Sequence, residues 1–192
     1  MRTLVIGDIH GGLKALIQVL NRVEVKDDDT LIFLGDYVDG WSESAQVAQF
    51  LIELSRTISC IFIKGNHDAW CEDWLDTGTV NASWYMHGGK TTMASYDGMT
   101  AENKKLHLQF FKKMPMYYLD DANRLFVHAG FTSMHGVKKE VFVETFYFDR
   151  TLWETAVALD KQIDVNSHLY PNRFKRYKEI YIGHTPTTRF NS

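Results

Sequence analysis

Two carboxylates directly follow a short apolar segment near the start of the chain. Residues 30–34 are predicted to form a buried strand because four consecutive apolar residues follow Thr30. Gly35 then permits a sharp turn, and Asp36 and Asp39 follow three residues apart. Paired acids at the end of a buried strand are costly unless positive charge compensates them. We therefore expect Asp36 to bridge two divalent metal ions and Asp39 to orient a catalytic histidine, whereas this segment alone also fits an acidic surface turn.

Length and composition are those of one globular domain. The chain has 192 residues, of which 45% are hydrophobic and 23% charged. A net charge of −3 without a long basic segment argues against nucleic-acid binding. The two cysteines, Cys60 and Cys71, match no metal or redox spacing and are expected to be reduced. The sequence has no signal-peptide pattern and no membrane-spanning apolar run, which predicts a cytoplasmic protein without membrane contact.

Strands and helices alternate along the first half of the sequence. Strands are predicted at 3–6, 30–34 and 59–63, and helices at 12–22 and 69–77. Another helix is predicted to be capped by Ser42, with Val47, Leu51 and Leu54 on its apolar face. This order favours an α/β fold with a largely parallel sheet and right-handed crossovers. The second half is predicted to contain a helix at 101–114, a strand at 124–127, a helix at about 150–160 capped by Asp149, and a last strand at 179–182.

Each of these five strands ends in a segment that carries metal-binding side chains. The candidate residues are Asp8 and His10, Asp36 and Asp39, Asn66 and His67, His128, and His184. Because ligands bind outside the carboxyl ends of the strands in open α/β sheets, we expect these side chains to converge. Imidazole and carboxylate together suit Mn²⁺, Fe²⁺ or Zn²⁺ better than Ca²⁺ or Mg²⁺. A single histidine after a strand is more often structural, but the series of five predicts a metal site.

The same five segments resemble the signature blocks of the calcineurin-like metallophosphoesterases. They read GDIHG at 7–11, GDYVD at 35–39, GNHD at 65–68, HAG at 128–130 and GHT at 183–185. The sequence is most similar to the phosphoprotein phosphatase branch, which contains bacterial and phage serine/threonine protein phosphatases and diadenosine tetraphosphatases. The resemblance implies one domain over residues 1–192, an αββα sandwich in which two central mixed sheets are flanked by helices. Family members usually continue beyond the last block, so further strands of the second sheet are expected to be missing.

The resemblance also implies a metal-binding role for six of these residues. Two divalent ions are expected, with Mn²⁺ preferred and Fe²⁺ or Zn²⁺ as alternatives. The first ion would be held by Asp8, His10 and Asp36, and the second by Asp36, Asn66, His128 and His184. A hydroxide bridging both ions would attack phosphorus directly, without a phosphoenzyme.

His67 and Asp39 are the catalytic residues that the resemblance implies. His67 would protonate the leaving alkoxide, and Asp39 would hold the other ring nitrogen and favour the imidazolium form. Asn66 is expected to contact substrate as well as metal.

One position departs from the family pattern. Protein phosphatases of this branch usually carry an arginine that binds the phosphate where this chain has Gly40, followed by Trp41. Arg150 is the expected replacement, and the weaker candidates, which more often would have a surface role, are Arg173, Arg176 and Lys90.

The sequence supports three candidate functions. The first is a two-metal-dependent phosphomonoesterase of serine/threonine protein phosphatase type that acts on phosphorylated protein. The alternative is a hydrolase of dinucleoside polyphosphates or another small phosphate ester, which Asp68 in the third block favours weakly because this residue can also cap the helix at 69–77. Trp41, Trp84 and Tyr85 could then stack on a base, although such residues more often form core. The third function, motivated by the missing arginine, is a metal- or phosphate-binding protein without turnover.

Overall fold

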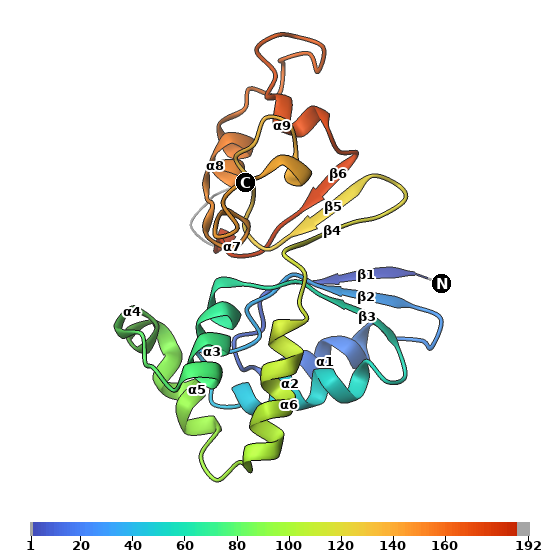
Figure 1. The fold of residues 1–192 in the computed structure, drawn as a ribbon. Coiled ribbons are helices and arrows are strands. Elements are labelled where there is room, and N and C mark those ends of the chain that lie inside the picture. Colours follow the sequence, from blue (N-terminus) through green and yellow to red (C-terminus); the bar gives the residue numbers. More distant parts are fainter. Residues whose placement is uncertain (1, 188–192) are drawn as a thin grey trace.

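The computed structural model describes residues 2–187, and in it two sheets pack face to face between layers of helices (Figure 1). The first sheet contains β1 (Thr3–Ile6), β2 (Thr30–Phe33) and β3 (Ser59–Phe62) in that order, with both pairs parallel. The second contains β4 (Tyr117–Leu119), β5 (Arg124–Val127) and β6 (Glu179–Tyr181). In it β4 pairs antiparallel and β6 parallel to β5. The predicted two-sheet α/β fold is confirmed, but only the second sheet is mixed among the described strands, where two mixed sheets were expected.

Helices cover the outer side of each sheet (Figure 1). The first half contains α1 (Leu13–Arg22), α2 (Ser44–Leu54), α3 (Asn66–Thr77), α4 (Ala82–Trp84), the kinked turn η1 (Tyr85–Gly89), α5 (Lys90–Ser95) and α6 (Ala101–Lys112). The second half contains the short 3-10 helix η2 (Val137–Lys139), α7 (Thr145–Phe148), α8 (Thr151–Ala158) and α9 (Asn172–Lys175). The chain thus forms the layered sandwich that the family resemblance implied.

The packing of β2 on both of its faces explains why its sequence is continuously apolar. Side chains alternate along a strand, so Leu31 and Phe33 pack into the core of the first half, whereas Ile32 and Leu34 pack against the second sheet. Phe126 of β5 joins the same cluster between the sheets from the other side. A strand buried on both faces has no position for a polar side chain. This inter-sheet cluster holds the ends of β2 and β5 next to each other.

The predicted helices and strands are present, with differences in their bounds. Helix α2 begins at Ser44, and its N-cap position is Glu43 rather than the predicted Ser42; α3 begins at Asn66 rather than at 69. Strand β4 was not predicted, because three half-buried residues after Pro115 give little periodic signal. The N-cap position of α8 is Arg150 rather than the predicted Asp149, but the Asp149 side chain accepts hydrogen bonds from two backbone N–H groups at the start of that helix.

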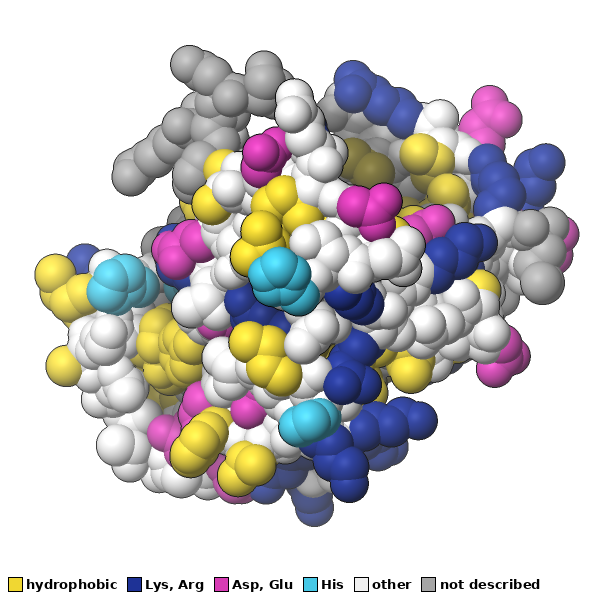
Figure 2. Space-filling model, turned by 90° about the horizontal axis from the view of Figure 1, so that it is seen from above, with side chains coloured by type: hydrophobic (Ala, Val, Ile, Leu, Met, Phe, Trp, Pro, Cys, Tyr) yellow, Lys and Arg dark blue, Asp and Glu magenta, His cyan; other side chains and the backbone are white. Residues whose placement is uncertain are grey.

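Charged side chains of both signs cover the second half. Figure 2 looks down on this half and shows lysine and arginine side chains mainly along its right and lower side, with acidic side chains among them. Exposed basic residues of this half include Lys138, Lys139, Lys175, Arg176 and Lys178. In the part of the chain from 2 to 187, no helix combines the length and the apolar character needed to cross a bilayer.

Candidate metal centre and active site

All six predicted metal ligands lie together at one edge of the two sheets. The parallel strands β1, β2 and β3 end at the same edge, and β5 and β6 lead to it from the second sheet. Neighbouring members of the set are in contact: His10 Nε2 lies 3.8 Å from Asp8 Oδ2, and His128 Nε2 lies 3.2 Å from Asn66 Oδ1. The backbone N–H of His184 donates to the Asp8 carboxylate at 3.2 Å. The topology therefore brings together residues that are far apart in sequence.

The Asp36 carboxylate is the centre of this cluster. Its Oδ2 atom lies 3.8 Å from His10 Nε2 and 3.3 Å from His128 Nε2, and the residue is only 2% exposed. Asp36 belongs to two groups of potential metal-binding residues. Within each group, the ligand atoms lie within 4.8 Å of one another. One group is His10, Asp36 and His67, and the other is Asp36, His128 and His184. One buried carboxylate thus lies between two places where a metal ion could bind.

The loops at this edge hold their side chains in unusual backbone conformations. Of the six residues other than glycine that have positive φ in the described chain, four are predicted site residues: His10, Asp36, Asp39 and His184. Such conformations cost on the order of 1–3 kcal/mol each and persist only where surrounding contacts determine them. Gly35, just before Asp36, has φ +105°, and a Cβ atom there would lie 2.7 Å from the Gly65 nitrogen. Tight packing therefore aims the Asp36 carboxylate.

Backbone carbonyls orient two of the histidines. His128 Nδ1 donates to the Leu34 carbonyl at 2.8 Å, and His10 Nδ1 donates to the Val38 carbonyl at 3.1 Å. Both acceptors belong to the chain segment around Asp36. Because Nδ1 carries the proton in each of these hydrogen bonds, Nε2 is the nitrogen that can bind a metal, and it points at the acids.

Burial and mutual charge shift the pKa values of these groups. Burial alone would raise the pKa of Asp36, but the positive charge of His128 and its hydrogen bond hold that pKa below its usual range. Burial opposes protonation of His128, yet Asp36 raises the pKa of His128 to about 9. Burial and the charge of His128 lower the pKa of His184 to about 4. The buried carboxylate is thus compensated by a proton on His128, and a divalent cation would take the place of that proton.

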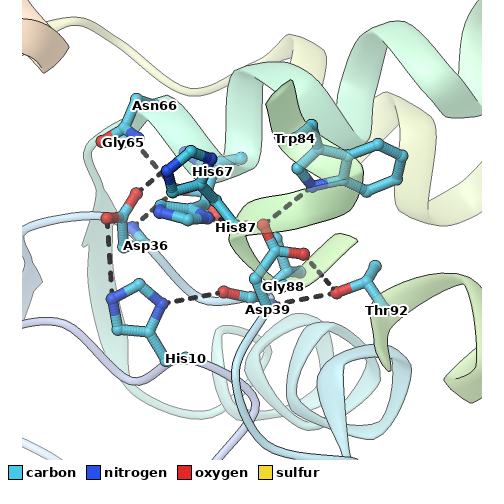
Figure 3. A network of polar contacts seen from close by, with 12 residues as sticks. His10, Asp36, Asp39, Gly65, Asn66, His67, Trp84, His87, Gly88 and Thr92 are labelled. Atoms are coloured by element: carbon cyan, nitrogen blue, oxygen red, sulfur yellow. Dashed lines mark hydrogen bonds and ion pairs between the residues drawn. The ribbon is translucent and has the colours of Figure 1, made fainter. Parts of the chain in front are cut away.

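His67 and Asp39 form a hydrogen-bonded pair beside this cluster. His67 Nδ1 lies 2.5 Å from Asp39 Oδ2, and Asp39 is fully buried. Trp84 Nε1 donates to the same oxygen at 2.7 Å, and the Thr92 hydroxyl donates to Oδ1 at 2.6 Å (Figure 3). Burial would lower the pKa of His67, but the hydrogen bond to Asp39 raises it above its ordinary value. The imidazole is therefore favoured in its protonated form, and Asp39 engages its Nδ1 rather than its Nε2.

The sequence did not predict Trp84 and Thr92 as partners of Asp39. They lie 45 and 53 positions after it, and no local pattern connects them to that residue. Trp84 was considered for base stacking, but its ring is fully buried and its N–H is used by Asp39. Tyr85, also considered, is 40% exposed.

Asp68 has a larger role than the helix cap expected for it. Its carboxylate accepts hydrogen bonds from the backbone N–H groups of Asp36 at 2.7 Å, Tyr37 at 2.9 Å and Gly65 at 2.9 Å. It therefore ties the loop after β2 to the loop after β3. Burial and the Asp36 charge raise the pKa of Asp68 to about 7.

The structure gives a reason for the missing arginine. Gly40 has φ +82°, and a Cβ atom there would lie 3.3 Å from His10 Cβ, so any side chain at this position would be strained. Arg150 is exposed at the start of α8, and its charge is close enough to contribute to the low pKa of His184. Arg173 is buried and donates to backbone and threonine oxygens within the second half, which makes it structural.

The family model for calcineurin-like phosphoesterases matches residues 1–192, so the chain belongs to this family, as its five sequence blocks predicted. Family membership identifies a phosphoester hydrolase. The chain is 24% identical over 202 residues to an asymmetrical bis(5'-nucleosyl)-tetraphosphatase from Geobacillus sp. (strain WCH70), covering 97% of this chain and 79% of that protein. It is 29% identical over 188 residues to a symmetrical bis(5'-nucleosyl)-tetraphosphatase from Pectobacterium atrosepticum, covering 97% of this chain and 57% of that protein.

Among solved structures, a protein serine/threonine phosphatase from Saccharomyces cerevisiae superimposes with a TM-score of 0.59 at 16% identity. The match covers 96% of this chain and 61% of the yeast chain. This likeness supports the fold, and the fold places the five ligand-bearing loops at one edge.

Replacing Asp68 by asparagine should loosen the loop that carries Asp36. An amide NH₂ group would face the Tyr37 N–H, leaving buried donors without acceptors, so we expect the free energy of unfolding to fall by about 2–3 kcal/mol. Urea unfolding measures it. Asp73→Asn, exposed on the same helix, is the matched control and should change stability by no more than about 0.5 kcal/mol. Equal effects of the two variants would contradict the role given to Asp68.

Proposed function

We propose that this chain is a two-metal-dependent phosphoesterase. The observation that carries the proposal is the position of Asp36 Oδ2 between two histidines, 3.8 Å from His10 Nε2 and 3.3 Å from His128 Nε2. Imidazole, carboxylate and amide donors in this number fit two transition-metal ions such as Mn²⁺, Fe²⁺ or Zn²⁺. When bound, such ions supply positive charge for the phosphoryl oxygens and make a water molecule acidic. The residues that would hold them are Asp8, His10, Asp36, Asn66, His128 and His184.

His67 is the proposed proton donor to the leaving group. Its Nδ1 is engaged by Asp39, so a proton on Nε2 can be given to the leaving oxygen as the bond to phosphorus breaks. Trp84 and Thr92 fix the Asp39 carboxylate, which keeps the imidazole in one orientation. This pair gives the site a proton donor that a metal- or phosphate-binding protein without turnover would not need.

Arg150 and Asn66 are the proposed contacts to the substrate phosphate. Arg150 lies near enough to His184 to influence its pKa, and its guanidinium would pair with phosphate oxygens that approach the metals. The Asn66 side chain is buried at the start of α3, where its amide can donate to the same group.

For the substrate, we infer a dinucleoside polyphosphate rather than a phosphorylated protein, which reverses the order that the sequence favoured. The names of the Geobacillus and Pectobacterium relatives support this substrate class. The backbone at Gly40 adds support, because its positive φ would strain the arginine that is typical of protein phosphatases at this position. The phosphoprotein substrate stays the second candidate, since the branch that the sequence resembles also contains serine/threonine protein phosphatases.

Replacing His67 by asparagine tests the proton donor. We expect the Mn²⁺-dependent rate on an alkyl phosphate, such as phosphoserine, to fall by roughly 10²–10⁴ because the alkoxide then leaves without a proton. The rate on p-nitrophenyl phosphate should fall much less, since nitrophenolate is a good leaving group. Exposed His135, replaced by asparagine, is the matched control. Equal losses on both substrates would show that His67 is not the acid.

A side-by-side measurement tests the substrate class. With Mn²⁺, kcat/KM for diadenosine tetraphosphate should exceed that for a phosphothreonine peptide by about a hundredfold, or some 2.7 kcal/mol in transition-state binding. A preference for the peptide would overturn the dinucleotide assignment and leave the phosphoesterase assignment intact.

A further inference from the structure

Three aromatic rings from different elements meet beside the proposed proton donor. Trp70 of α3 contacts His67 edge to face, with ring centroids 5.2 Å apart. Trp70 also contacts His87 of η1 at 6.5 Å, nearly parallel at 26°, and Phe148 of α7 at 5.6 Å. We call Trp70, His87 and Phe148 the aromatic wall. It combines rings from both halves of the molecule and adjoins the site through His67.

The wall becomes more exposed with distance from the site. The His67 side chain is 15% exposed and Trp70 is half-buried, whereas His87 is exposed and Phe148 is 42% exposed. Phe148 lies outside the hydrophobic clusters formed by the described residues. Trp70 packs against the core of the first half, whereas the exposed Phe148 ring, which contacts Trp70, gains little for folding and is available to a ligand.

The backbone holds His87 at the wall. Gly88 has φ +115°, and a Cβ atom there would lie 2.8 Å from the Gly40 nitrogen and 3.0 Å from Asp39 Cβ. The η1 turn therefore packs directly on the loop that carries Asp39. His87 Nδ1 donates to the Ser83 carbonyl at 2.7 Å, which fixes the ring in its orientation. His87 and Gly88 have backbone angles that are not helical, so the chain kinks here between α4 and α5 and presents the His87 ring at the kink.

The position of His67 decides which part of a substrate meets the wall. A proton donor must lie within hydrogen-bond reach of the leaving oxygen, so the leaving group occupies the space next to His67. Trp70 borders that space, and the wall continues past Trp70 to two further rings. It therefore suits a leaving group whose planar ring is separated from the reacting phosphorus by several bonds.

We propose that the aromatic wall is the binding site for the base of a nucleoside phosphate leaving group, with Trp70 and Phe148 as specificity-determining residues. Stacking on aromatic side chains binds any base, because every base has a π-face. The inference rests on the proposed function, and it adds residues that no sequence block contains. An aliphatic leaving group such as a serine side chain offers no plane for these rings.

The test compares a substrate that has bases with one that has none. In the Mn²⁺-loaded full chain, Trp70→Leu and Phe148→Leu should lower kcat/KM for diadenosine tetraphosphate about tenfold more than for inorganic tripolyphosphate, which has the same anhydride bonds. Trp70→Phe, which keeps a ring, should recover most of the loss. Phe142→Leu is the matched control, because Phe142 is 69% exposed on the same segment but is not part of the wall.

Equal losses on both substrates would overturn the proposal, since they would mean that Trp70 acts only by packing on His67. Binding provides a readout that needs no turnover: the His67→Asn protein should bind ATP more tightly than tripolyphosphate, and Phe148→Leu in that background should remove the difference. No difference before the second substitution would likewise overturn it. If the proposed function is wrong, even p-nitrophenyl phosphate will not be hydrolysed with Mn²⁺. The binding comparison then still tests whether the aromatic wall binds a base.

Discussion

The buried carboxylate of Asp36 is the interaction on which the rest of this structure depends. A charged group that is 2% exposed is unfavourable unless cations surround it, and here His128 and His10 face it from two sides. Much of the surrounding architecture serves to hold this group in place. Asp68 binds the backbone of its loop, and close packing of Gly35 against Gly65 prevents the loop from relaxing.

The two sheets contribute to the site through a shared core. Side chains of β2 and β5 interlock between the sheets, and the His128 ring then reaches back to the carbonyl of Leu34 at the end of β2. A shift of one sheet against the other would break this hydrogen bond and move His128 away from Asp36. The site therefore derives its geometry from apolar packing, while its charge derives from residues on loops at the strand ends.

The sequence predicted the parts of this site that follow from local pattern. A continuous apolar run predicted the buried β2, and polar residues after each strand predicted where ligands converge, because parallel strands end at one edge. It did not predict contacts between distant segments. Trp84 and Thr92 fix Asp39 from 45 and 53 positions away, and Trp70 meets Phe148 only once the two halves have packed. Sequence alone does not separate a core aromatic residue from one that contacts a ligand. Trp41, Trp84 and Tyr85 were therefore the residues considered for base stacking, and Trp70 was not among them, although Trp84 is buried.

The central claim is that one carboxylate serves two metal ions, and electron paramagnetic resonance of the Mn²⁺-loaded protein tests it most directly. Two ions that share Asp36 should be magnetically coupled, so the chain should bind two Mn²⁺ and give the spectrum of a coupled pair rather than of isolated ions. Asp36→Asn should lose the coupled signal. A single isolated Mn²⁺ per chain, or a coupled signal that survives Asp36→Asn, would contradict the account.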